Sequence, residues 1–123
     1  MERVARNPGF PLGADVQVFP LHLLEHVAET VDDPAVREHV SLYFYEHPER
    51  YRVHHIEPKP RWRRPELRLQ LDYPEDHAFL EAVYGALEPQ LGPVFGLDAI
   101  LDLLDERPQL AAINAHCEEK AAR

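Results

Sequence analysis

Apolar and polar side chains alternate along three short segments of the chain, which predicts three short strands. The segments are 15–19, 51–56 and 67–71. In the last of them Leu67, Leu69 and Leu71 share one face of an extended chain, because the side chains of a strand alternate with period two. Polar residues occupy the opposite face and lead to Asp72. The pattern therefore predicts a strand that ends at an aspartate.

Apolar residues recur at helical spacing in the other segments, which predicts four to five helices. We expect them over 21–31, 34–46, 74 to the break before Gly92, 97–106 and 108–120. Asp33 and Pro34 form a typical helix start, with a capping side chain followed by proline at the first helical position. Glu75 and Asp76 come directly after Pro74 and complement the positive end of the next helix.

The order of these elements favours an α/β layer arrangement over a helical bundle or a sandwich. Segment 40–45 is rich in aromatic and branched residues, so it is also compatible with a strand. Residues 1–13 are dense in glycine and proline, which indicates an irregular loop. A sheet of three short strands leaves its edges bare, and we expect a partner chain or further sequence to pair with them.

The length of 123 residues suits one compact domain, and the net charge of -9 limits its partners. Such an acidic balance argues against general binding to nucleic acids or anionic membranes. The sequence has no apolar run of membrane-spanning length, and residues 1–8 lack the apolar core of a signal peptide, so we expect a cytoplasmic protein. With Cys117 as the single cysteine, we expect no disulfide and no cysteine metal site, and we interpret this residue as structural or idle.

Asp72 is the first candidate for a binding site. In open α/β sheets ligands gather beyond the carboxyl ends of strands, which is where the predicted order of elements places Asp72. An aspartate before a helix is also a common helix cap, and the spacing alone favours that interpretation. Both interpretations stay open at the level of the residue pattern.

Charged clusters offer further candidates. Arg37, Glu38 and His39 place a cation, an anion and a titratable ring within one helical turn, which suits substrate binding or acid/base chemistry. A solvated helix face is the more common meaning of such a cluster. The basic loop 59–65 and Arg68 carry concentrated positive charge that suits phosphate or carboxylate ligands, unless nearby glutamates neutralise it.

A zinc-protease pattern, H-x-x-E-H, occurs at residues 22–26. The apolar stripe of the predicted helix lies on its opposite face, so these histidines are expected in solvent rather than in a catalytic cleft. The sequence has no glycine-rich phosphate loop, nucleophile elbow or catalytic triad pattern. Zinc catalysis is therefore not expected from this pattern.

Four stretches follow one another in an order and spacing typical of a known family. They are F-P-L-G-A-D-V-Q-V-F at 10–19, R-E-H-V-S-L-Y-F-Y-E-H-P-E-R-Y at 37–51, R-R-P-E-L-R-L-Q-L-D-Y-P-E-D at 63–76 and L-L-D-E-R-P-Q-L-A-A-I-N-A-H at 103–116. Together they resemble the cytidylyltransferases related to spore-coat polysaccharide synthesis, relatives of the enzymes that activate keto-deoxy-octulosonate and sialic acids. The resemblance implies the C-terminal portion of a Rossmann-like nucleotide-diphospho-sugar transferase fold, with about three short strands and four to five helices.

The resemblance also implies an activity and a cofactor. Such enzymes couple CTP to a sugar acid or related sugar, releasing pyrophosphate and leaving a CMP-activated sugar. Mg²⁺ held by aspartates neutralises charge around the phosphates in this reaction. Asp72 matches the aspartate of the family's V-D-T-P-E-D motif, which implies that it is a magnesium ligand.

Other matching positions are expected on the sugar side of the cleft. Asp15 matches the aspartate of the family's D-V-E-V-F segment, and Arg37, Glu38 and His39 match its R-E-H segment. Arg68 is assigned to an anionic group of the substrate.

The family pattern begins with a strand and a basic, glycine-containing loop for CTP, and a second magnesium aspartate follows in that half. Residues 1–123 resemble only the C-terminal half, as a single α/β domain. We therefore expect no turnover of CTP by the chain alone, and either a homodimer or a missing N-terminal half as partner. The alternative function is a non-catalytic dimerisation or interaction module derived from the same family.

Overall fold

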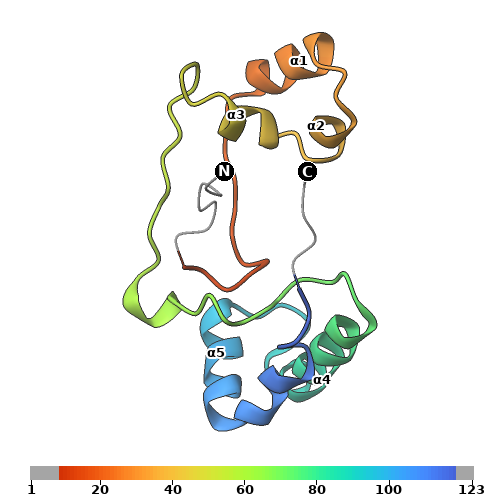
Figure 1. Ribbon diagram of the computed structural model, residues 1–123. Helices are drawn as coiled ribbons and strands as arrows, with labels where there is room; N and C mark the ends of the chain where they lie inside the picture. Colours follow the sequence, from red (N-terminus) through yellow and green to blue (C-terminus); the bar gives the residue numbers. More distant parts are fainter. Residues whose placement is uncertain (1–8, 119–123) are drawn as a thin grey trace. The chain divides into compact units, whose positions relative to one another are not determined.

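The computed structural model describes residues 9–118 and consists of helices joined by extended segments (Figure 1). It contains two compact units, one formed by Val16–Ile56 and the other by Gly9–Asp15 with Glu57–Glu118. Within the described residues, no helix is both long enough and apolar enough to cross a membrane. Residues 1–8 of the predicted loop over 1–13, and the end of the predicted helix over 108–120, lie outside the described residues.

The first unit is a small helical cluster. Its helices are α1 (Leu21–Thr30), α2 (Pro34–Glu38) and α3 (Leu42–Glu46). They enclose a core of four buried residues, Val27, Val36, Leu42 and Phe44. The Asp33 carboxylate accepts a hydrogen bond from the backbone N–H of Ala35 at 2.9 Å, which confirms the predicted cap.

The predicted helix over 34–46 is broken between α2 and α3, and the core explains the break. In one continuous helix, about 100° per residue would place Val36, Leu42 and Phe44 on widely separated faces. The turn after α2, in which the Leu42 N–H donates to the His39 carbonyl at 2.9 Å, brings all three side chains into one core. Burial of apolar side chains thus overrides the helical pattern.

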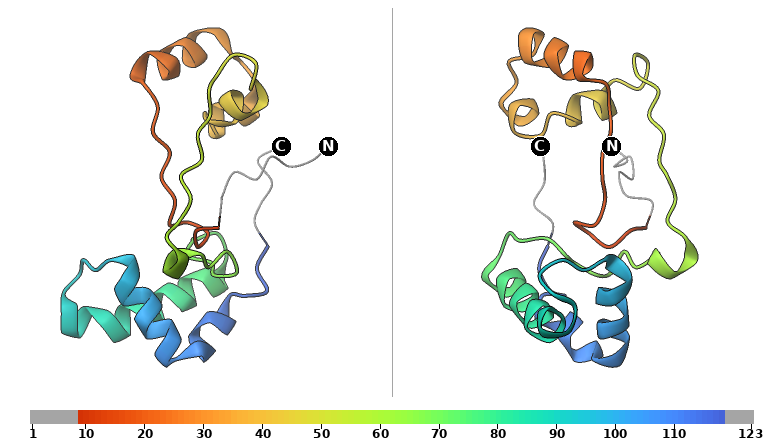
Figure 2. Two further views of the ribbon diagram at one scale, coloured as in Figure 1. Left: turned by 90° about the vertical axis from the view of Figure 1, so that its left-hand side faces the viewer. Right: turned by 180° about the vertical axis from the view of Figure 1, so that it is seen from behind.

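The second unit is built on two longer helices, visible from two further sides in Figure 2. They are α4 (Pro74–Leu91) and α5 (Leu97–Glu106), and both pack on the 3-10 helix η2 (Pro108–Ile113). A second 3-10 turn, η1 (Pro60–Trp62), lies within the basic loop. The core consists of Leu67, Phe79, Val83, Leu87, Leu101, Leu103 and Leu104. The predicted helix starts at Pro74 and Leu97 are confirmed, whereas the last predicted helix is a 3-10 turn.

The prediction of an α/β fold with a three-stranded sheet is wrong for the described residues. Figure 1 shows extended segments without strand arrows at 15–19 and 51–56. Segment 67–71 has one isolated parallel bridge, between Leu12 and Arg68. Alternation specifies an extended backbone, but a strand also needs a neighbour that supplies ladder hydrogen bonds. The exposed fractions of Val16 and Val18, 84% and 91%, show that this apolar alternation meets no core.

The Leu12 bridge nevertheless fixes the segment that carries the candidate site. The Leu12 N–H donates to the Leu67 carbonyl at 2.9 Å, and the Leu69 N–H donates to the Leu12 carbonyl at 2.7 Å. Gly13 then turns the chain with a φ of 91°, a value that favours glycine. Its missing Cβ leaves room for the carbonyl of Leu69, which such a Cβ would approach to 2.8 Å.

Candidate functional site

A buried ion pair lies between the extended segment 67–71 and the start of α4. The Arg68 guanidinium donates from Nε to Asp76 Oδ1 at 2.8 Å and from Nη2 to Asp76 Oδ2 at 3.0 Å. The side chains of Arg68 and Asp76 are 3% and 0% exposed. Asp72 and Asn114 bond to this pair, and we call the four residues Arg68, Asp72, Asp76 and Asn114 the Arg68 cluster.

Asp76 is the centre of the Arg68 cluster and also holds the N-terminus of α4. Its Oδ2 accepts the backbone N–H groups of Asp72 and Tyr73 at 2.9 and 3.0 Å. Its Oδ1 also accepts a hydrogen bond from Asn114 Nδ2 at 2.9 Å. The hydrogen bond from Arg68 is the main cause that holds the pKa of Asp76 well below its usual range, although burial acts in the opposite direction. Asp76 is therefore a buried, ionised anchor.

Asp72 lies at the solvent side of the Arg68 cluster. Its side chain is 35% exposed, and its Oδ2 accepts a hydrogen bond from Arg68 Nη2 at 3.1 Å. Among the described residues no hydrogen bond to its Oδ1 is present. Asp76, and not Asp72, bonds the backbone N–H groups at the helix start. The cap interpretation of Asp72 is thus replaced by a carboxylate that is held on one side and open on the other.

Arg68 occupies a different place from the one expected of a substrate ligand. Its guanidinium is buried against two aspartates, and its carbon Cζ lies 5.3 Å from the centre of the Tyr73 ring. One nitrogen, Nη1, is buried without a hydrogen-bond partner among the described residues. The same guanidinium bonds both carboxylates and so holds Asp72 beside Asp76, while binding of a substrate anion by Arg68 stays a prediction.

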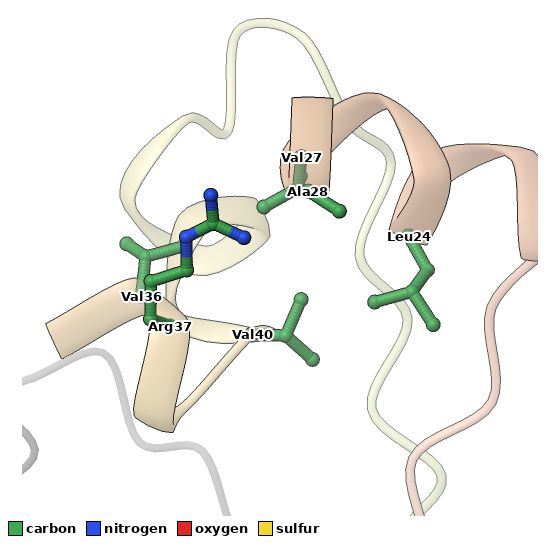
Figure 3. A pocket seen from close by; sticks show the side chains of 6 residues that line it. All are labelled: Leu24, Val27, Ala28, Val36, Arg37 and Val40. Atoms are coloured by element: carbon green, nitrogen blue, oxygen red, sulfur yellow. The ribbon is translucent and has the colours of Figure 1, made fainter. Parts of the chain in front are cut away.

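The R-E-H candidates lie on the surface of the first unit. Arg37 is in α2, its side chain is 54% exposed, and its Nη2 is 3.7 Å from Asp32 Oδ1. Glu38 and His39 are exposed, and His39 Nε2 is 3.7 Å from Glu38 Oε1. Arg37 borders a small hollow of about 100 Å³ between α1 and α2 (Figure 3), whose other lining residues are apolar: Leu24, Val27, Ala28, Val36 and Val40.

Asp15 is exposed at the end of the short segment 9–15 of the second unit. The structure therefore brings Arg68 and Asp72 into contact. It describes Arg37, Glu38 and His39 in the other unit, so a common cleft with Asp72 stays a prediction.

The basic loop is neutralised by the acidic face of α5. Arg61 bonds Asp102, and Arg64 Nη1 lies 3.2 Å from Asp105 Oδ1. The Trp62 indole N–H donates to Asp98 at 2.8 Å and is the main cause that lowers the pKa of that carboxyl. Arg63 and Arg64 also pair with Glu57 and Glu66, at 3.6 and 2.6 Å, so the predicted neutralisation by nearby glutamates is confirmed and α5 adds further acidic partners.

Sequence reasoning missed Asp76 and Asn114 as members of the site. Asp76 carries a recognisable signal, since an acidic residue at the third helical position can bond the backbone N–H that precedes the helix. Asn114 lies 46 residues after Arg68 and bonds its carbonyl at 3.0 Å. No local pattern indicates that contact. The H-x-x-E-H residues lie on the exposed face of α1, as expected.

Comparison with known proteins finds two distant relatives. The chain is 30% identical over 113 residues to the uncharacterized protein MJ1063 of Methanocaldococcus jannaschii, a match that covers 91% of this chain and 45% of that protein. It is 32% identical over 103 residues to the spore coat polysaccharide biosynthesis protein SpsF of Bacillus subtilis, which covers 82% of this chain and 42% of that protein.

The chain thus spans less than half the length of both curated relatives it matches. No family model matches it. No solved structure matches it significantly. The chain is a distant homologue of SpsF. Three members of the Arg68 cluster, Arg68, Asp72 and Asp76, lie within segment 63–76.

Proposed function

We propose that this chain is the metal-binding and sugar-binding portion of a cytidylyltransferase-type nucleotidyltransferase. The complete protein would join CTP and a sugar or sugar acid to give a CMP-sugar and pyrophosphate, in polysaccharide biosynthesis. The homology to the spore coat polysaccharide biosynthesis protein SpsF supports a role in polysaccharide biosynthesis. The presentation of Asp72 by a buried arginine at the start of α4 is the observation that carries the proposal.

The donor set at this position suits Mg²⁺. One or two carboxylates, completed by phosphates and water, are its usual protein ligands. The side chains of Arg68, Asp72 and Asp76 carry a formal charge of -1 together, and the exposed Asp72 is the member that solvent reaches. Asp72 would hold the ion through Oδ1, and the ion would supply neutralisation of phosphate charge.

The chain's own residues have distinct tasks in this proposal. Asp76 and Arg68 keep the Asp72 carboxylate in one orientation, because two guanidinium nitrogens bond Asp76 and one of them also bonds Asp72. Such preorganisation is valuable for electrostatic stabilisation, since the site does not reorganise during the reaction. Arg37 and His39 would bind polar or anionic groups of the sugar.

The proposal predicts that the 123 residues alone do not turn over CTP. The sequence has no glycine-rich phosphate loop, and a single magnesium aspartate makes a weak site. The test measures pyrophosphate release from CTP and candidate sugar acids by the isolated chain and by a fusion to the part of SpsF that the chain does not match. Release by the fusion alone supports the proposal. Brisk release by the isolated chain, or none by either protein, contradicts it.

A second candidate function is an interaction module that forms a homodimer. The observation that favours it is the extended segment 15–19, where Val16 and Val18 are strongly exposed. Ile56, at the end of the other extended segment, is 72% exposed. Exposed apolar side chains on an unpaired extended backbone are typical of segments that pair with another chain.

Sedimentation equilibrium without nucleotide or metal tests this candidate. A stable dimer that dissociates in the Val16→Asp, Val18→Asp double variant supports it, because buried charge opposes association. A clean monomer at all concentrations contradicts it. The Leu21→Asp variant, at the 67% exposed first residue of α1, is the matched control.

A further inference from the structure

The side chains of Glu75, His116 and Cys117 converge in the second unit. One potential ligand atom from each residue lies within 4.8 Å of the other two. His116 Nε2 is 3.9 Å from Glu75 Oε1. Glu75 is in the first turn of α4, whereas the other two residues follow η2, so this group joins two segments that are distant in sequence.

Buried neighbours fix the backbone on both sides of the group. Asp76, next to Glu75, is fully buried, and Asn114, two residues before His116, is 1% exposed. The Asn114 amide donates to Asp76 at 2.9 Å, and the Cys117 backbone N–H donates to the Asn114 carbonyl at 3.1 Å. A buried hydrogen bond thus ties together the two segments from which the three side chains project.

The donor atoms are one carboxylate oxygen, one imidazole nitrogen and one sulfur. This mixture suits Zn²⁺ and similar transition metals, whereas Mg²⁺ and Ca²⁺ prefer oxygen alone. Tetrahedral binding of Zn²⁺ places ligand atoms roughly 3.5 Å apart, so a contraction of about 1 Å would close the group around an ion. The side chains of Glu75 and His116 are 46% and 65% exposed, and their rotation displaces little packing.

We propose that Glu75, His116 and Cys117 form a binding site for Zn²⁺ or a similar transition metal ion. Cys117 binds as the thiolate and releases its proton to solvent, and the fourth coordination position is open to water or a ligand. The site differs from the magnesium position proposed at Asp72 in its residues and in its donor chemistry. It stands whether or not the chain belongs to a cytidylyltransferase.

Co²⁺ added to the full chain under reducing conditions provides the test. The expected result is a thiolate-to-cobalt charge-transfer band with the intense visible bands of tetrahedral coordination, both abolished by one equivalent of Zn²⁺. Cys117→Ser should remove the charge-transfer band. His116→Gln and Glu75→Gln should each weaken Zn²⁺ binding about tenfold or more, since each removes one of three protein ligands.

His77 provides a matched control on the same helix. Its Nδ1 lies 3.8 Å from Glu81 Oε2, a similar histidine and glutamate pair without a thiol. His77→Gln should bind Zn²⁺ within about twofold of the parent chain, because it removes no proposed ligand. Absence of the charge-transfer band, unchanged Zn²⁺ binding by Cys117→Ser, or equal weakening by His77→Gln and His116→Gln would overturn the proposal.

Discussion

Replacement of Arg68 by methionine tests the buried ion pair on which the candidate site depends. The change keeps much of the side-chain length but removes the charge and both hydrogen bonds to Asp76. It leaves a fully buried carboxylate that retains three donors: two backbone N–H groups and Asn114 Nδ2. Breaking a buried pair from one side typically costs about 3–5 kcal/mol. Because three donors remain, we expect a loss of about 3 kcal/mol in the free energy of unfolding.

Urea unfolding followed by Trp62 fluorescence measures this loss. Trp62 is the single tryptophan and packs against the core of the second unit, so its signal reports on the unit that contains Arg68. With a slope of about 1 kcal/mol per molar urea, the midpoint should fall by about 3 M. Arg68→Lys should reduce the free energy of unfolding less than Arg68→Met, because lysine keeps the positive charge although it cannot bond Asp76 in a bidentate way.

Arg64→Met is the matched control, at an arginine that is only partly buried. Arg64 pairs with Glu66 and Asp105 at 2.6 and 3.2 Å, but its side chain is 31% exposed. Such pairs contribute about 0–1 kcal/mol. If Arg68→Met costs no more than Arg64→Met, the reasoning about the buried pair is refuted.

Four further substitutions test the second unit, each followed by Trp62 fluorescence. The folded-state pKa of Asp76 lies below its ordinary value of 3.8, so the contribution of Asp76 to the free energy of unfolding should be complete above about pH 5. That contribution should be lost as the pH falls from there toward the folded-state pKa. Asp76→Asn should flatten this dependence of the free energy of unfolding on pH. Asn114→Ala removes a donor from Asp76 and unpairs the Arg68 carbonyl, and should cost about 1–3 kcal/mol. Gly13→Ala should destabilise by about 1–3 kcal/mol, because of its positive φ and the close Leu69 carbonyl. Gly85→Ala, where a new Cβ meets open space within α4, should instead stabilise by about 0.5–1 kcal/mol. Equal effects of the two glycine changes, a pH profile unaltered by Asp76→Asn, or a neutral Asn114→Ala would each contradict the corresponding argument.

Helix starts could be predicted from the sequence because their signals are local. Asp33 caps α2 through the backbone N–H two residues on, and Pro74 opens α4. Each signal involves residues that are neighbours in the chain, so no tertiary information is needed. Prediction of the break between α2 and α3 would have required knowledge of which side chains share a core.

The lack of a sheet among the described residues, and the buried part of the site, could not be predicted. Alternation at Leu67, Leu69 and Leu71 correctly indicates an extended backbone, but the existence of a neighbouring strand is not encoded in that segment. The sequence places Arg68 on the polar face of its segment and predicts an anionic ligand for it, but does not indicate its burial. Its partner Asp76 lies in the first turn of α4, and Asn114 joins them from the far end of the unit. Such contacts arise only when the helices pack.

The Asp72→Asn variant of the fusion with SpsF tests the central claim most directly, with pyrophosphate release from CTP as the readout. If Asp72 holds Mg²⁺, release should require Mg²⁺ and fall about 100-fold or more in this variant. The Glu81→Gln variant, which changes a 77% exposed acid elsewhere on α4, should stay within about twofold of the parent. Asp72→Asn with the parent rate would contradict the account.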